Sequence, residues 1–180
     1  MNRKGKNMKI DRRGFLAIPV LLLSLLLIPA VNGDDQQNTF NWFVFSATPP
    51  QSAAASDGSR IRVTGTGTFQ VGDPEQVTGG GTWATFDSSG SPTGSGNFQV
   101  DRLVKFDLAP GSVPGQPTFH GGLAFFRITY DDGSNGVLVV GCHLPGSPPP
   151  VPEGFSASKG FVNYWSGFNG PTLFVAVTQG

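Results

Sequence analysis

Two arginines stand where strand periodicity would turn them toward an apolar interior. In the segment NFQVDRLVKFDL alternation puts Arg102 on the face of Phe106, and in GGLAFFRITY it puts Arg127 on the face of Phe125. Because a lone charged side chain is costly to bury, two inward guanidinium groups would hold a carboxylate or another anionic head group. The alternative is a β-bulge near Asp101, which would flip the register and leave Arg102 in solvent.

His120 and Tyr130 belong to the same predicted strand as Arg127. Strand alternation puts His120 on one face with Phe126 and Tyr130. His120 could therefore act as a general base toward a ligand, although a hydrogen-bonded strand histidine without such a role is the favoured alternative. We take Arg102, Arg127, His120 and Tyr130 as candidate ligand-binding residues and assign no catalytic residue.

The single cysteine and the two histidines limit the other chemistries. Cys142 has no partner for an internal disulfide, and alternation turns its neighbour His143 to the opposite face, so we predict a buried, unreactive thiol. Two histidines without a cluster of acidic residues argue against a zinc site. The loop 130–136 lacks the closing Glu of a calcium loop. The sequence therefore predicts neither a metal nor a cofactor.

β-Strands must position these residues, because eight segments have strand-like patterns and none has a convincing helical period. Clusters of Gly, Pro, Asn and Asp separate the segments, as expected for turns. The predicted strands are 39–47, 60–71, 78–87, 94–108, 118–131, 136–144, 157–167 and 172–178.

Long strands and glycine pairs favour an all-β fold built as an eight-stranded antiparallel β-barrel. The pattern Gly-x-Gly-x-Phe-Gln-Val occurs at 65–71 and again at 94–100. Glycines inside strands mark bends or bulges where a sheet coils. Eight strands close a barrel with room for side chains or one small ligand. The alternative architecture is a jelly-roll-like β-sandwich.

The glycine-rich middle third of the chain resembles a known group of barrels. The residues TGTF at 66–69 and VTGGGTW at 77–83 are similar to the Gly-rich strand pairs of the dirigent and allene oxide cyclase barrels. Three successive glycines depart from the Gly-Thr-Gly of that family. The resemblance implies an eight-stranded barrel with an apolar lumen, and no lumen residue of the family carries over to a position in this chain.

The first 33 residues have the pattern of an export signal, with basic residues followed by an apolar run. The pair Arg12-Arg13 resembles the twin-arginine signal of bacteria and archaea, although Asp11 stands where Ser or Thr is usual; the ordinary secretory route is the alternative. We expect cleavage after Gly33 rather than a retained membrane anchor. Residues 34–180 would then form one domain, secreted, periplasmic or at the cell surface, without stable membrane insertion.

Charge narrows the possible partners. Residues 1–33 hold six of the 12 basic residues and one of the 12 acidic residues, so residues 34–180 carry a net charge of −5. This charge argues against nucleic acid and anionic membrane surfaces as partners.

The leading functional hypothesis is that a small, mostly apolar or amphipathic molecule binds in the barrel lumen. One alternative is a cyclase-like or dirigent-like enzyme that steers a reactive intermediate by shape. The other is a non-catalytic surface or matrix protein with a filled core. The sequence favours a non-catalytic protein and leaves the oligomeric state open.

Overall fold

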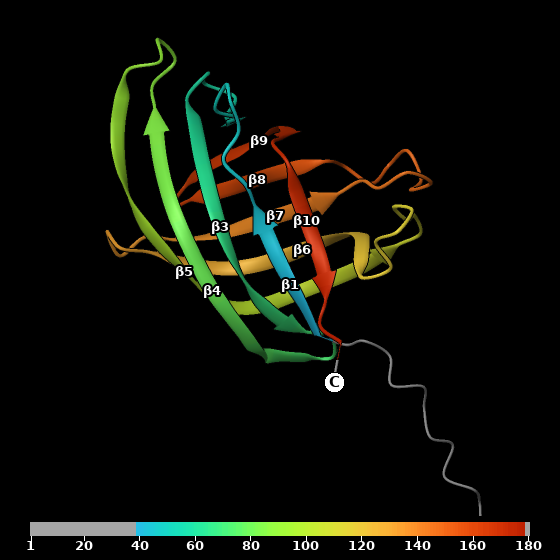
Figure 1. The fold of residues 1–180 in the computed structure, drawn as a ribbon. Coiled ribbons are helices and arrows are strands. Elements are labelled where there is room, and N and C mark those ends of the chain that lie inside the picture. Colours follow the sequence, from blue (N-terminus) through green and yellow to red (C-terminus); the bar gives the residue numbers. More distant parts are fainter. Residues whose placement is uncertain (1–38, 179–180) are drawn as a thin grey trace, which may run out of the picture. The chain divides into compact units, whose positions relative to one another are not determined.

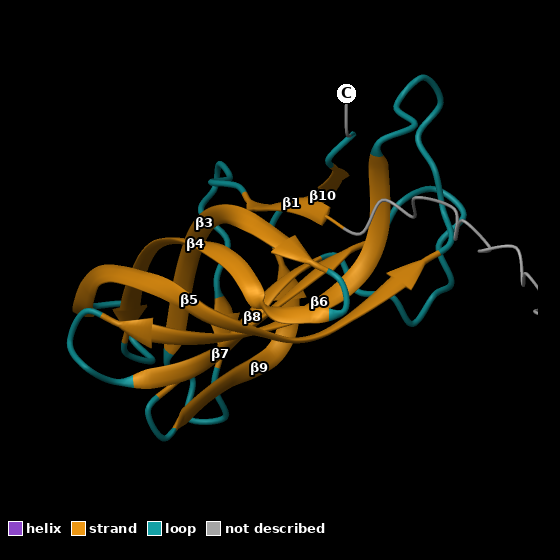
Figure 2. Cartoon of the chain, turned by 90° about the horizontal axis from the view of Figure 1, so that it is seen from below, coloured by secondary structure: helices purple, strands orange, loops and turns teal. Residues whose placement is uncertain are grey.

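The computed structural model describes residues 39–178, and the export signal predicted at 1–33 lies outside them. The described chain consists of ten β-strands joined by turns and loops, which confirms the all-β prediction (Figure 2). The strands are β1 (Thr39–Val44), β2 (Ala53–Ala54), β3 (Arg60–Gln70), β4 (Asp73–Phe86), β5 (Pro92–Ala109), β6 (Phe119–Tyr130), β7 (Asn135–Cys142), β8 (Gly154–Lys159), β9 (Val162–Asn169) and β10 (Thr172–Ala176).

The ten strands form one antiparallel sheet whose pairings close on themselves. Their order is β1-β10-β6-β5-β4-β3-β2-β9-β8-β7, and β1 also pairs with β3 while β6 also pairs with β7. Strands β1, β10, β6, β5, β4 and β3 are thus a continuous ring of hydrogen-bonded neighbours. The sheet is ring-like, and it has ten strands where we predicted eight.

Two features account for the difference in strand number. The predicted strand 157–167 is divided by a turn at Gly160, whose φ of +56° suits glycine, into the antiparallel neighbours β8 and β9. Ala53 and Ala54 form the short strand β2, which pairs with β3 and with β9. Two residues are too few for an alternating pattern to indicate a strand.

Aromatic side chains fill the space between strands that cross each other. Figure 1 shows β1, β3, β4 and β10 running across the direction of β6, β7, β8 and β9. The ring of Phe69 on β3 lies 4.9 Å from that of Phe106 on β5 and 5.7 Å from that of Phe126 on β6. Phe40 and Phe174 lie 5.1 Å from Phe106. These separations are typical of packed aromatic pairs, so the protein's own side chains occupy this part of the interior.

Glycines of β3 and β4 let Trp42 of β1 approach the backbone. Gly65 pairs with Gly81, and a Cβ added at Gly65 would lie 3.1 Å from Cη2 of the indole. A Cβ at Gly67 would lie 2.7 Å from Nε1 of Trp42. The indole is fully buried and its Nε1 donates to the carbonyl oxygen of Thr78 at 3.4 Å. The glycine repeat therefore makes room for a core side chain.

Candidate functional site

Arg102 and Arg127 pair across β5 and β6, and both side chains are exposed. The register of β5 shifts between Val100 and Arg102, which makes Asp101 an extra, bulged residue. Arg102 consequently faces solvent, where its Nη1 lies 3.6 Å from Oε1 of Glu75 on β4. Of the two orientations that the sequence left open for Arg102, the structure has the one with the bulge, and the guanidinium group does not point into the interior.

Arg127 shares a face with Phe125, as expected, but this is the outer face of β6. Its two neighbours in the chain, Phe126 and Ile128, are buried while Arg127 is exposed. Strand alternation grouped these residues correctly, but we assigned the face of Arg127 and Phe125 to the interior when it is the outer face. The error arose because both faces of β6 carry apolar residues. Neither arginine lines the aromatic interior.

His120 and Tyr130 lie on the inner face of β6, so the structure does not bring them into one site with the arginines. The hydroxyl of buried Tyr130 donates to the carbonyl oxygen of Ser158 at 2.8 Å, and burial raises the pKa of this phenol. The half-buried ring of His120 meets Phe40 edge-on at 5.4 Å. Its buried Nε2 has no hydrogen-bond partner among residues 39–178. Tyr130 is built into the core, and the half-buried His120 packs against the core residue Phe40.

His120→Phe is expected to stabilise the protein by about 1 kcal/mol at neutral pH, because the variant removes an unsatisfied buried nitrogen. Burial lowers the pKa of His120 below 6.5, so protonation favours the unfolded chain and wild-type stability falls as the pH drops below 6.5. The His120→Phe variant has no group that titrates at this position, so its stability should not show this decrease in acid. Melting temperatures between pH 8 and pH 5 check both points, and equal pH dependence in the two proteins would refute the assignment.

Lys159 at the end of β8 is held by polar and aromatic groups from distant parts of the chain. Its Nζ donates to the carboxylate of Asp132 and, at 2.9 Å, to Oγ of Ser134. The same atom lies 4.2 Å from the ring centroid of Trp83 and 4.9 Å from that of Tyr130. The side chain is only 13% exposed. This cluster fixes the turn between β6 and β7, and sequence reasoning missed it because its members are far apart in the chain.

Asp132→Asn is expected to lower stability at neutral pH, with an effect that disappears in acid. Hydrogen bonds from Lys159 first, and then from Ser134, lower the pKa of Asp132 to about 2. A depressed pKa means that this stabilisation is complete above the unfolded value near 3.8 and is lost as the pH falls toward about 2. The difference in melting temperature between wild type and variant should therefore shrink between pH 4 and pH 2.

Asp57→Asn is the matched control for this experiment. Asp57 accepts hydrogen bonds from the backbone N and the hydroxyl of Ser59, as Asp132 does from Ser134, but no lysine donates to it within the described chain. We expect a smaller destabilisation than in Asp132→Asn. Equal effects of the two substitutions would show that Lys159 contributes nothing to the turn.

Cys142 is buried, as predicted, and is 1% exposed. Burial, reinforced by the nearby charge of Glu153, raises the pKa of the thiol to about 12, so the group stays protonated at neutral pH. His143 is exposed and its backbone N donates to Oε2 of Glu153 at 2.7 Å. The other oxygen of Glu153 accepts from the backbone N of Thr172 at 3.0 Å. This carboxylate joins the end of β7 to the start of β10.

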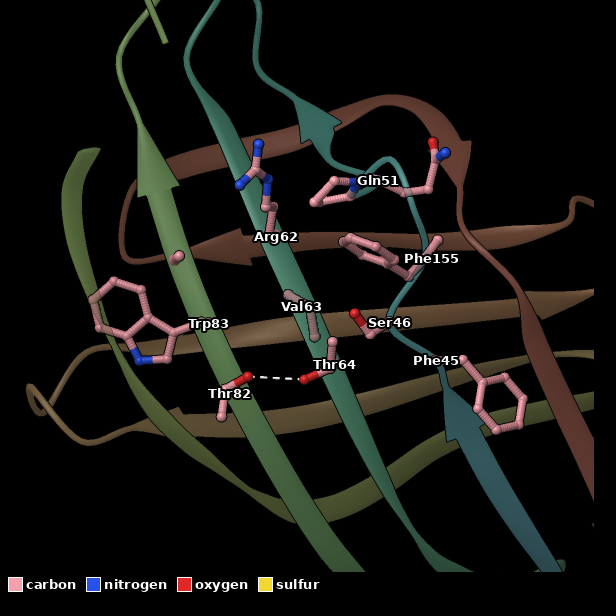
Figure 3. A pocket seen from close by; sticks show the side chains of 12 residues that line it. Phe45, Ser46, Gln51, Arg62, Val63, Thr64, Thr82, Trp83 and Phe155 are labelled. Carbon is pink, nitrogen blue, oxygen red and sulfur yellow. Dashed lines mark hydrogen bonds between the residues drawn. The ribbon is translucent and has the colours of Figure 1, made fainter. Parts of the chain in front are cut away.

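A hollow of about 270 Å³ lies beside the outer face of β3 and β4, where the segment 45–51 runs past them (Figure 3). Strand alternation explains its position, because Arg62, Thr64 and Thr82 point away from the buried side chains of Val63 and Trp83. The lining residues are Phe45, Ser46, Ala47, Pro50, Gln51, Arg62, Val63, Thr64, Thr82, Trp83, Ala84 and Phe155.

Polar groups with spare hydrogen-bonding capacity line this hollow. The guanidinium carbon of Arg62 lies 4.2 Å from the ring centroid of Phe86, a cation–π contact that favours one orientation of the group. The hydroxyls of Thr64 and Thr82 form a hydrogen bond of 2.8 Å (Figure 3). One hydroxyl donates in that pair, so the proton of the other is free for a ligand. The sequence put Arg62 and Thr64 on a polar face but gave no sign that 45–51 passes beside it.

No known protein-family model matches this chain, and neither a curated protein nor a solved structure matches it. Within residues 39–178, no group of three or more His, Cys, Asp and Glu residues is placed to hold a metal ion. No helix in the same residues is long and apolar enough to cross a membrane. The function is therefore inferred from the side chains described above.

Proposed function

We propose that this is an exported, non-catalytic protein that binds a small, mostly apolar molecule in the hollow beside β3 and β4. The observation that carries the proposal is that apolar and polar side chains line the same hollow. Phe45 and Phe155 supply apolar walls, and Arg62, Thr64 and Thr82 supply polar groups. Binding sites for small molecules typically combine apolar walls with a few convergent polar groups.

The packing of the interior supports a surface site over a site in a lumen. We propose that the ring-like sheet is a β-barrel with a filled interior, since the rings of Phe69 and Phe106 lie 4.9 Å apart at its centre. The polar anchors expected for a lumen ligand, Arg102 and Arg127, are exposed on the outer face. A cyclase-like or dirigent-like enzyme would need an enclosed space around its intermediate, and the same aromatic packing argues against one.

A second candidate, a surface or matrix protein, is favoured by an apolar groove on the outer face of β6 to β9. The groove has a volume of about 460 Å³, and Trp165 beside it is 57% exposed. Exposed apolar patches often mark sites of interaction with other molecules. The groove is lined by Leu123, Phe125, Val139, Pro150, Pro152, Ser156, Trp165 and Phe168.

Export by the signal at 1–33 belongs to the same proposal and places the protein in the periplasm, at the cell surface or in the medium. The net charge of −5 on residues 34–180 supports a small molecule, and not nucleic acid, as the partner. Neither part of this proposal requires a metal or a cofactor.

Native mass spectrometry of the secreted protein, purified gently from its own host, tests the proposal. We expect one small molecule per chain in the wild type and none in Ala84→Trp, because Ala84 lines the hollow and an indole there would fill it. Thr78→Trp is the control, since Thr78 is exposed on the same face of β4 but outside the hollow. A ligand that survives in Ala84→Trp would refute this site. A wild type with the bare mass of residues 34–180 would favour the surface or matrix protein.

A further inference from the structure

Arg62 is the one charged side chain that lines the hollow beside β3 and β4. Within residues 39–178 it takes part in none of the ion pairs, which join Arg102 to Glu75, Lys105 to Asp107 and Lys159 to Asp132. A guanidinium group offers five N–H donors. Among residues 39–178, no side-chain hydrogen bond uses the donors of Arg62, whose guanidinium group contacts the ring of Phe86. The hollow therefore presents a cation whose charge is not balanced by a neighbouring carboxylate.

The position of Arg62 is set by β3 and by Phe86. Arg62 pairs with Ala84 on β4, so its side chain leaves the sheet at the wall of the hollow. The ring of Phe86, 4.2 Å from the guanidinium carbon, covers one face of the group and leaves its edges available. Arg60, the neighbour of Arg62 on the same face of β3, is exposed and does not line the hollow.

We propose that the ligand of this hollow is a small organic carboxylate whose acid group pairs with Arg62. This inference rests on the proposed function and adds the chemical class of the molecule. A planar guanidinium binds a carboxylate through two parallel hydrogen bonds. The apolar part of the ligand lies against Phe45 and Phe155, and the free hydroxyl proton of the Thr64–Thr82 pair is donated to a second polar atom.

The size of the hollow limits the ligand further. Its volume of about 270 Å³ is slightly below the roughly 300–1,000 Å³ of common small-molecule pockets. A single ring or a short chain with one acid group suits this space, whereas a long fatty acid does not.

Phenylacetate and its uncharged analogue phenylacetamide are suitable probes. We would titrate each into the isotope-labelled secreted protein and follow the amide NMR signals of residues 45–51. We expect phenylacetate to bind at least tenfold more tightly than phenylacetamide, and Arg62→Gln to reduce the affinity for phenylacetate to that for the amide. Arg60→Gln removes the same charge two residues away outside the hollow and should keep the preference.

The outcomes separate this inference from the proposed function. Equal binding of acid and amide, lost in Ala84→Trp, would overturn the carboxylate assignment and leave binding in the hollow supported. An undiminished preference for the acid in Arg62→Gln would also overturn it. If neither probe shifts signals of residues 45–51, both the carboxylate assignment and the binding site are refuted.

Discussion

Gly67→Ala is expected to lower the free energy of unfolding by about 3 kcal/mol, a large effect for one methyl group. The added Cβ would overlap the carbonyl oxygen of Thr78 on β4 and would lie 2.7 Å from Nε1 of Trp42. Both neighbours are fixed, because Thr78 belongs to a paired strand and Trp42 is fully buried. The substitution must therefore separate β3 from β4 or displace the indole. Urea unfolding followed by tryptophan fluorescence measures the change.

Gly90→Ala is the matched control for this experiment. Gly90 has a φ of +89°, but a Cβ there would meet no atom within 4 Å. Its substitution introduces backbone strain without a steric overlap, and we expect a cost of about 1 kcal/mol. If Gly67→Ala lowers the free energy of unfolding by no more than Gly90→Ala does, the glycine repeat is not needed for the close packing of Trp42.

Phe69→Ala should destabilise the protein by about 4 kcal/mol, because it removes a fully buried ring from the centre of the aromatic interior. Phe69 has ring contacts with Phe40, Phe106, Phe126 and Phe174 at centroid distances from 4.9 to 6.0 Å. These side chains come from β1, β5, β6 and β10, which restricts how far they can move into the space left by the ring. Calorimetric unfolding of wild type and variant gives the difference.

The same variant tests whether the interior is filled in the wild type. An apolar cavity that the surrounding side chains cannot close takes up small apolar molecules. We expect toluene to raise the melting temperature of Phe69→Ala and to leave that of the wild type unchanged. A stabilising effect of toluene on the wild type would instead show space in the interior and would revive the hypothesis of a lumen ligand.

The sequence predicted the all-β class and the places of most strands, because both depend on local patterns of alternation and turn residues. It did not predict the turn at Gly160, where one strand pattern covers two strands. It also left the orientation of Arg102 open. A bulge at Asp101 reverses the direction of Arg102 and Leu103, before a second register shift between Leu103 and Lys105 reverses it again. Alternation alone does not show on which residues the extra positions fall.

The candidate site depended even more on contacts between distant segments. The hollow forms where 45–51 passes beside β3 and β4, and Phe155 of β8 completes it. Arg62 looked like an ordinary residue of a solvated strand face, and nothing in its neighbourhood in the sequence distinguished it from Arg60. The four residues chosen from the sequence had chemically suitable types, but the fold places Arg102 and Arg127 on the outer face. It places Tyr130 in the core and the half-buried His120 against Phe40.

The pairing of β1 with β10 has a consequence for the export that we propose. Phe40 lies opposite Ala176 and Val44 opposite Thr172, so the first described strand completes its pairing only with the last. A ribosome must release the chain as far as β10 before the ring can close, and contacts between residues so distant in the sequence make folding slow. Under the export that we propose, the precursor would reach the membrane either fully folded or still without its closing strand. An export route that carries folded proteins would have to wait until the ring has closed. A route that threads unfolded chains could act while the closing strand is still unpaired.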